Sequence, residues 1–218
     1  MRPGTMNFTE AREEMVERQL RRRGIRDPRV LDAMRSIPRE EFVPAGLREK
    51  AYLDEPVQIG GGQTISQPYI TALMVESLEL TGGETVLEVG AGSGYHAAVL
   101  GAIAGRVVSL EIQPALAALA EANLRRAGVG GNVRVICGDG SLGWPEEAPY
   151  DAISVAAAAP FVPPALLEQL KDPGRLVIPV GDIDEQDLCL VAKRAGEVRS
   201  RAITGCRFVP LRGGQGWR

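Results

Sequence analysis

The chain has 218 residues, 44% of them hydrophobic, and a formal net charge of −3. This size suits one globular domain with a large core. The lack of any apolar run of about 18 residues excludes a transmembrane helix, and few aromatics with one dense basic run, Arg21–Arg23, argue against nucleic-acid binding. Residues 1–6 lack the apolar segment of a signal peptide, so we expect a cytoplasmic protein with a poorly ordered start.

The cysteine and histidine content limits the possible chemistry. Cys137, Cys189 and Cys206 are odd in number, widely spaced and set in apolar strand-like segments, so we interpret them as reduced core residues. His96 is the one histidine of the chain. A multi-histidine metal centre is therefore excluded, and we expect no metal and no Ser-His or Cys-His relay.

The first 60 residues predict a helical cap. Asn7 and Glu10 resemble a capping box for a helix that runs to about Arg23. The pair Asp27-Pro28 predicts the start of a second helix. Short turns and extended pieces should fill residues 39–59. This region carries too little apolar surface to fold alone, so we expect it to cover a larger unit.

A glycine-rich polar loop occupies residues 60–68. Three consecutive glycines are followed by Gln63, Thr64 and Ser66, and then by a segment with helical spacing of apolar residues. One interpretation is a loop that holds an anionic group near a helix N-terminus. The other is a glycine turn with Ser66 as the N-cap and Pro68 in the first turn. The loop alone leaves both open.

From residue 84 strands and helices alternate. We predict strands over 85–89, 106–110, 133–137, 150–155 and 174–180, helices over 95–104, 114–127 and 164–170, and an antiparallel hairpin from 187–194 and 198–211. This order predicts an α/β fold with a Rossmann-like, doubly wound and mostly parallel sheet. We expect one domain over 1–218, with the cap and the polar loop in 1–79 and a cofactor-binding core in 80–218.

Candidate cofactor residues follow the predicted parallel strands. Ligands in such folds bind at the carboxyl ends of the strands, where the strand order reverses. Glu111 ends the second strand and is placed to accept both ribose hydroxyls of a nucleotide-like ligand, and Asp139 is placed to accept from an adenine amine. The candidate residues at these strand ends are Glu88, Gly90, Gly92, Gly94, Glu111, Asp139 and Gly140.

Two cofactors compete for this site. Residues 92–97 fit a loose G-x-G-x-x-A dinucleotide pattern, which alone is a weak signal. The fuller Glu-x-Gly-x-Gly-x-Gly over 88–94, with Gly-Asp-Gly at 138–140, is the pattern of class I S-adenosylmethionine methyltransferases. A dinucleotide enzyme would also need a proton-transfer residue, and His96 inside a helix supplies one poorly.

The chain resembles the protein-L-isoaspartate O-methyltransferases over nearly its whole length. The segments that carry the resemblance are 15–20, 38–44, 51–56, 62–68, 86–95, 138–140, 143–153, 157–160 and 208–211. Gly-Gln-Thr-Ile-Ser-Gln-Pro at 62–68 is similar to the signature loop of that family and is the most specific of them.

The resemblance implies methyl transfer from S-adenosyl-L-methionine to the free α-carboxyl of L-isoaspartyl residues in damaged proteins and peptides. S-Adenosyl-L-homocysteine is the other product, and the ester then cyclises to a succinimide, which initiates repair. Ser66 would orient the carboxylate through its hydroxyl, and Thr64, Ile65 and Ile112 would join the cofactor contacts. Gln215 is a candidate ligand contact, and Asp54 is a candidate for orienting the substrate or for stabilising the loop.

The implied chemistry agrees with a chain that has one histidine. A carboxylate is already ionised at pH 7 and a sulfonium methyl is an activated electrophile, so no general base is required. We expect His96 to be a helix residue near the site. Three alternatives stay open: a methyltransferase with another acceptor, a binding module without catalysis, and a dinucleotide oxidoreductase. We expect a monomer that binds isoaspartyl proteins and neither nucleic acid nor membrane.

Overall fold

A twisted sheet carries the fold. The computed structural model describes residues 7–217, so the expectations for residues 1–6 lie outside it. Within the described part, seven strands pair in the order β5-β4-β3-β6-β7-β8-β9. Their bounds are β3 Thr85–Val89, β4 Arg106–Glu111, β5 Val133–Cys137, β6 Tyr150–Val155, β7 Leu170–Gly181, β8 Gln186–Arg194 and β9 Glu197–Cys206. The first five are parallel, and β8 and β9 are antiparallel, which confirms the predicted fold class.

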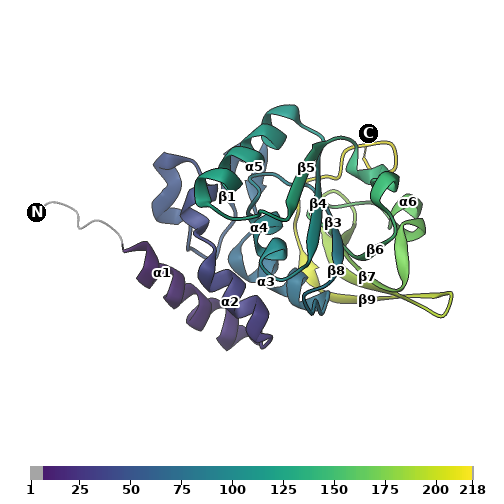
Figure 1. The fold of residues 1–218 in the computed structure, drawn as a ribbon, viewed down its shortest axis with the longest axis horizontal. Coiled ribbons are helices and arrows are strands. Elements are labelled where there is room, and N and C mark those ends of the chain that lie inside the picture. Colours follow the sequence, from purple (N-terminus) through teal and green to yellow (C-terminus); the bar gives the residue numbers. More distant parts are fainter. Residues whose placement is uncertain (1–6, 218) are drawn as a thin grey trace, which may run out of the picture.

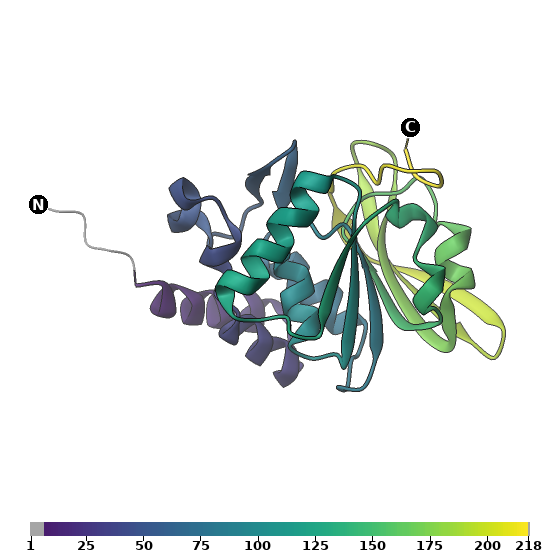
Figure 2. The same ribbon diagram turned by 45° about the horizontal axis from the view of Figure 1, so that its top comes forward.

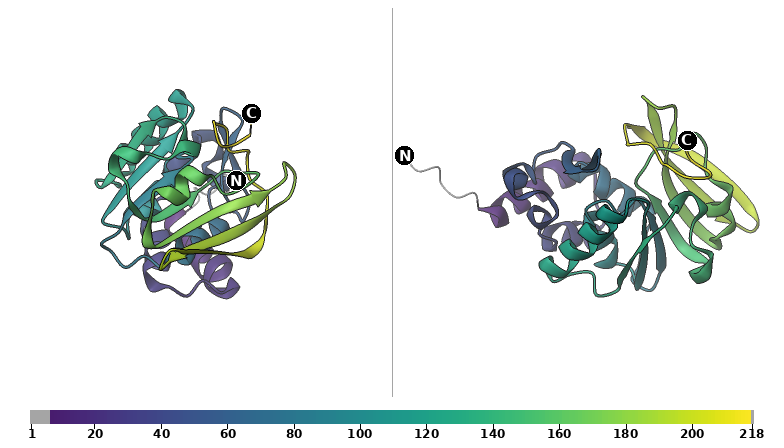
Figure 3. Two further views of the ribbon diagram at one scale, coloured as in Figure 1. Left: turned by 90° about the vertical axis from the view of Figure 1, so that its right-hand side faces the viewer. Right: turned by 90° about the horizontal axis from the view of Figure 1, so that it is seen from above.

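The strand order reverses around β3. Its residues pair with β4 on one side and with β6 on the other, so Glu88 lies beside both Ser109 and Ser154. The loops that leave the carboxyl ends of β3 and β6 therefore diverge and open a crevice, as expected for a doubly wound sheet. The β8–β9 hairpin lies at the end of the molecule away from the N-terminal helices (Figure 3).

Helices cover both faces of the sheet. Their bounds are α1 Phe8–Glu14, α2 Pro28–Ser36, α3 Pro68–Ser77, α4 Tyr95–Gly101, α5 Pro114–Ala127 and α6 Pro164–Glu168. The N-terminal helices pack with α4 and α5 on one side, and α6 lies on the other (Figure 1). Helices on both faces explain why the central strands are buried along almost their whole length.

The predicted start of the cap is confirmed. The Asn7 side chain accepts from the backbone N–H groups of Thr9 and Glu10 and caps α1. The helical path continues through a wider turn over Met15–Leu20 and a tighter one over Arg21–Arg23. It ends at Gly24, whose φ of 102° only glycine adopts readily.

A short hairpin was missed in the sequence. Strand β1 (Val57–Gly60) pairs antiparallel with β2 (Gln63–Ile65) across the glycine turn. Gly60, Gly61 and Gly62 all have positive φ, so the three glycines form the tip of this hairpin. Its strands are too short for a periodic signal. Figure 2 shows the hairpin and the yellow C-terminal segment at the same upper edge of the molecule.

Three further expectations need correction. Cys137 is exposed, and Cys189 and Cys206 are half-buried, so the cysteines are free thiols on strands but not core residues. Strand β7 begins at Leu170 rather than at residue 174, because its first part pairs with Tyr150 before an irregularity in the register. Strand β9 ends at Cys206, so residues 207–211 leave the sheet.

The cap shares a hydrophobic core with the sheet. Met15, Met34 and Phe42 of the cap are at most 1% exposed and belong to the same buried cluster as Tyr95 of α4 and Val107 of β4. Within residues 7–217, no helix combines the length and the apolar character needed to cross a membrane.

Because Met34 fills part of this shared core, Met34→Ala should lower the free energy of unfolding by about 2–5 kcal/mol through lost contacts and a residual cavity. Leu53→Ala, at a side chain that is 48% exposed, is the control and should cost less than about 0.5 kcal/mol. Urea denaturation checks both values. Equal effects of the two substitutions would contradict the packing described here.

Candidate active site

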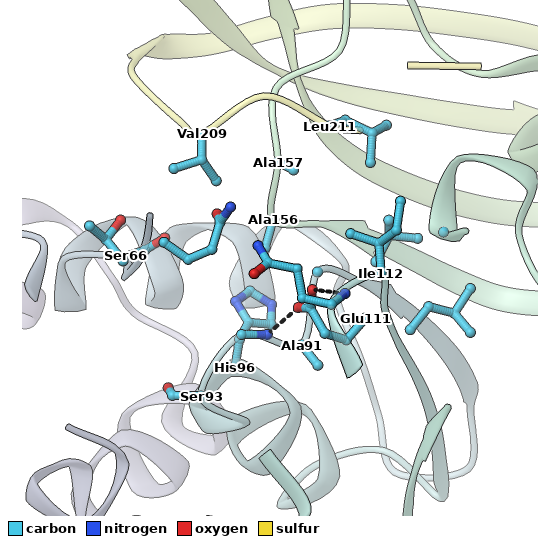
Figure 4. A pocket seen from close by; sticks show the side chains of 18 of the residues that line it. Ser66, Ala91, Ser93, His96, Glu111, Ile112, Ala156, Ala157, Val209 and Leu211 are labelled. Atoms are coloured by element: carbon cyan, nitrogen blue, oxygen red, sulfur yellow. Dashed lines mark hydrogen bonds between the residues drawn. The ribbon is translucent and has the colours of Figure 1, made fainter. Parts of the chain in front are cut away.

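A cavity opens at the carboxyl ends of the parallel strands. Residues 89–93 after β3, 110–113 after β4, Gly140 after β5 and 156–157 after β6 form its floor and one side. Residues 63–66 and 209–212 approach from the loop before α3 and from the segment after β9. Figure 4 shows Ser66, His96, Glu111 and Ile112 among the lining side chains, with Val209 and Leu211 on the C-terminal segment.

Glycines shape the turn after β3. Gly90, Gly92 and Gly94 have φ values of 95°, 54° and 88°, a region that side chains disfavour. At Gly94 a Cβ atom would lie 3.1 Å from the carbonyl oxygen of Ala120, so the glycine lets α4 and α5 pack closely. The glycines therefore hold a tight turn that leaves space beside the strand ends.

The carboxylate of Glu111 joins two neighbouring turns. One oxygen accepts from the backbone N–H of Gly92 at 2.9 Å, and the other accepts from that of Gln113 at 3.0 Å. The side chain is buried and lines the cavity. Each carboxylate oxygen has a second lone pair, so Glu111 can still accept from two adjacent hydroxyl groups.

Asp139 does not line the cavity. Its carboxylate accepts from the backbone N–H of Ser141 at 2.9 Å and from that of Gly214 at 2.7 Å. Gln215 is also held by hydrogen bonds. Its side-chain oxygen accepts from the backbone N–H of Ala165, and its own backbone N–H donates to the Ser141 hydroxyl. Asp139 and Gln215 thus fasten the C-terminal segment beside the site.

A row of buried polar groups runs beneath the cavity. Glu88 is fully buried, its carboxyl group accepts from the Ser109 hydroxyl, and its other oxygen has no hydrogen-bond partner in the structure. Burial raises the pKa of Glu88 to about 8, so this group is mainly neutral at pH 7. His96 Nε2 lies 3.0 Å from the Ser154 hydroxyl, and burial lowers the pKa of His96 to about 4.

Ser66 does not cap a helix. The N-cap of α3 is Gln67, and no side-chain hydrogen bond caps that helix, so the N-cap interpretation of Ser66 is wrong. Its backbone carbonyl instead accepts from Arg39 at 2.7 Å, and the residue lines the cavity. Asp54 forms an ion pair with Arg23 at 2.5 Å, which ties the loop after residue 50 to the end of the first helical stretch.

The structure brings most of the candidate residues together. Those that line the cavity are Thr64, Ile65, Ser66, Gly90, Gly92, Glu111, Ile112 and Gly140, whereas Glu88, Gly94 and Asp139 do not. Sequence reasoning missed Gln113, Ala156 and the segment 209–212. The resemblance at 208–211 was the one signal for that segment. Among residues 7–217, no three His, Cys, Asp or Glu side chains are grouped to hold a metal ion.

Burial lowers the pKa of His96 from its ordinary value of 6.5 to about 4. Stability should therefore be lost as the pH falls through this interval, because protons favour the unfolded state. Between pH 7 and 5 the wild type should lose about 2 kcal/mol more unfolding free energy than His96→Gln, as measured with urea. An NMR titration of this sole histidine with a midpoint near 6.5 in the folded protein would contradict the assignment.

Comparison with known proteins places the chain in a family. The family described as "Protein-L-isoaspartate(D-aspartate) O-methyltransferase" matches residues 10–216. A protein-L-isoaspartate O-methyltransferase of Methanoculleus marisnigri is 55% identical over 207 residues, which are 95% of this chain and 94% of that protein.

Two solved structures are similar over almost the whole chain. One, a protein-L-isoaspartate O-methyltransferase, has a TM-score of 0.81 at 33% identity and covers 94% of this chain and 66% of its own. The other is a beta-aspartate methyltransferase from Plasmodium falciparum in complex with S-adenosyl-L-homocysteine, with a TM-score of 0.78 at 27% identity, covering 95% and 99%. The chain described here belongs to the protein-L-isoaspartate(D-aspartate) O-methyltransferase family.

Proposed function

We propose that the chain transfers a methyl group from S-adenosyl-L-methionine to the free α-carboxyl of L-isoaspartyl residues in damaged proteins and peptides. The observation that carries this proposal is the meeting of two elements at one cavity. The glycine turn with Glu111 offers a nucleoside site, and the signature loop presents Ser66 from the other side. The product ester would cyclise to a succinimide without further help from the enzyme.

The residues present fit the cofactor. Glu111 keeps two free acceptor positions for a ribose diol. Gly140 lets the turn after β5 pack against β3, since a Cβ there would lie 2.5 Å from the side chain of Val89. We assign the cofactor contacts to Thr64, Ile65, Gly90, Gly92, Glu111, Ile112 and Gly140. We assign Glu88, Gly94 and Asp139 to the same site as supports from behind its wall. When bound, the cofactor supplies a methyl group on a positively charged sulfur.

The substrate needs orientation rather than deprotonation. Its carboxylate is ionised at neutral pH, and His96, with a pKa of about 4, is neutral there and is not required as a base. The protein's task is to align a carboxylate oxygen with the methyl carbon and to exclude water. We assign the orienting hydrogen bond to the hydroxyl of Ser66, which does not act as a covalent nucleophile.

We further propose one domain over residues 1–218, acting as a monomer in the cytoplasm without nucleic-acid partners. The shared core of cap and sheet supports the single domain. Unpaired cysteines suit a reducing compartment. Within the basic run, Arg21 pairs with Glu17, while Arg23 pairs with Asp54 and lies over the Tyr69 ring, which favours a structural role for these cations.

The proposed function is tested with two peptides that differ only in the linkage at one aspartate. The enzyme should transfer radiolabelled methyl groups to the isoaspartyl peptide and none to the normal aspartyl peptide. Equal labelling would remove the substrate assignment and favour another acceptor. No transfer despite S-adenosyl-L-homocysteine binding would leave a binding module, and stabilisation by NADH alone would favour an oxidoreductase.

Ser66→Ala should lower the turnover number by roughly ten- to a thousand-fold, because a hydrogen bond that orients and polarises the carboxylate is lost. Its melting temperature should stay near that of the wild type, since Ser66 caps no helix. Glu111→Ala is the matched comparison and should instead weaken S-adenosyl-L-homocysteine binding in calorimetry. Unchanged turnover of Ser66→Ala would exclude the proposed role.

A further inference from the structure

Arg39 is a buried cation at the junction of three parts of the molecule. Its side chain is 0% exposed although it lies in a short helical turn (Arg39–Phe42) of the cap. Nε donates to the carbonyl oxygen of Ala51 at 2.6 Å, and Nη2 donates to the carbonyl oxygen of Ser66 at 2.7 Å. The guanidinium also lies over the ring of Tyr95, 4.7 Å from its centroid. Arg39 therefore connects the cap, the signature loop and α4.

No carboxylate neutralises this charge within residues 7–217: Arg39 forms no ion pair there, and its Nη1 has no hydrogen-bond partner. Arg12 offers a contrast in the same cap. It is partly exposed, pairs with Glu40 at 3.0 Å and donates to the Tyr52 hydroxyl at 2.8 Å. An arginine that only fastened the cap could be paired with a carboxylate and partly exposed, as Arg12 is.

Burying a cation without a partner is costly. Two hydrogen bonds to carbonyl oxygens and the contact with one aromatic ring offset part of the desolvation cost. A neutral amide side chain could donate to the same carbonyl oxygens without a charge. The charge itself therefore calls for an explanation. Ser66 and Tyr95, the two residues that Arg39 touches on the side of the cavity, both line it. The cation thus lies one residue layer behind the part of the wall that presents Ser66.

We propose that Arg39 is a positioning residue for the methyl acceptor, holding Ser66 through its carbonyl and supplying an unneutralised positive charge behind the wall on which the acceptor carboxylate binds. This inference rests on the proposed function and deepens it. Electrostatic attraction in a buried site with a low dielectric is much less screened than in water. A cation there favours an anionic acceptor over a neutral one without touching it.

The test compares Arg39→Met and Arg39→Lys in the full-length enzyme. Methionine keeps an apolar stem of similar length but removes the charge and both hydrogen bonds, whereas lysine keeps the charge. We expect Arg39→Met to lower kcat/KM for an isoaspartyl peptide by at least tenfold, with S-adenosyl-L-homocysteine affinity within twofold of the wild type. The kcat/KM of Arg39→Lys should be at least threefold higher than that of Arg39→Met.

Tyr52→Phe is the matched control. Tyr52 is buried beside Ala51, and its hydroxyl binds Arg12 and Glu40 without touching the signature loop. It should lower the melting temperature while leaving kcat/KM within twofold of the wild type. The proposal is overturned if Tyr52→Phe loses as much kcat/KM as Arg39→Met, or if methionine and lysine at position 39 behave alike.

A wild-type measurement covers the case in which the Arg39 variants do not fold. The guanidinium NMR signals of Arg39 should shift when isoaspartyl peptide is added to enzyme saturated with S-adenosyl-L-homocysteine, and should not shift with the aspartyl peptide. Unchanged signals with both peptides would overturn the proposal. Methyl transfer by the wild type is measured first, so that failure of the proposed function is recognised separately as a lack of isoaspartyl labelling.

Discussion

The site depends on the parallel pairing of β3 with both β4 and β6. This pairing brings the turns after three strands to one edge of the sheet and leaves a crevice where the strand order reverses. Glu111 then locks two of these turns, because its carboxylate binds the N–H groups of Gly92 and Gln113. The same contacts that fix the backbone also aim the carboxylate, so the shape and the polarity of the cavity have one cause.

The opposite side of the cavity has a different origin. It is built from the cap and the signature loop, and Arg39 joins them through Ala51 and Ser66. Packing of Met34 and Phe42 around Tyr95 holds this assembly against α4. The molecule thus combines a cavity floor that is set by strand topology with an opposite wall that is set by side-chain packing.

Much of this could be predicted from the sequence. The alternation of buried strands and helices, the glycine turn and Glu111 all leave local patterns, so the fold class and the lining residues Gly90, Gly92, Glu111 and Gly140 follow from them. The assignment of Thr64, Ile65, Ser66 and Ile112 to the site came from the family resemblance. The β1–β2 hairpin was missed because its strands are too short to show a period. The engagement of Asp139 by Gly214, and the lining role of Val209, depend on the tertiary path of residues far apart in the chain, which local pattern does not encode.

The segment after β9 bears on how the enzyme is made. Residues 209–212 line the cavity, and the Trp217 indole N–H donates to the carbonyl oxygen of Ala158 at 3.1 Å. The glycine turn and Glu111 are synthesised about a hundred residues earlier, and a nascent chain emerges at about 5–20 residues per second. A nascent chain therefore holds the floor of the cavity some seconds before the segment that lines its other side has been made.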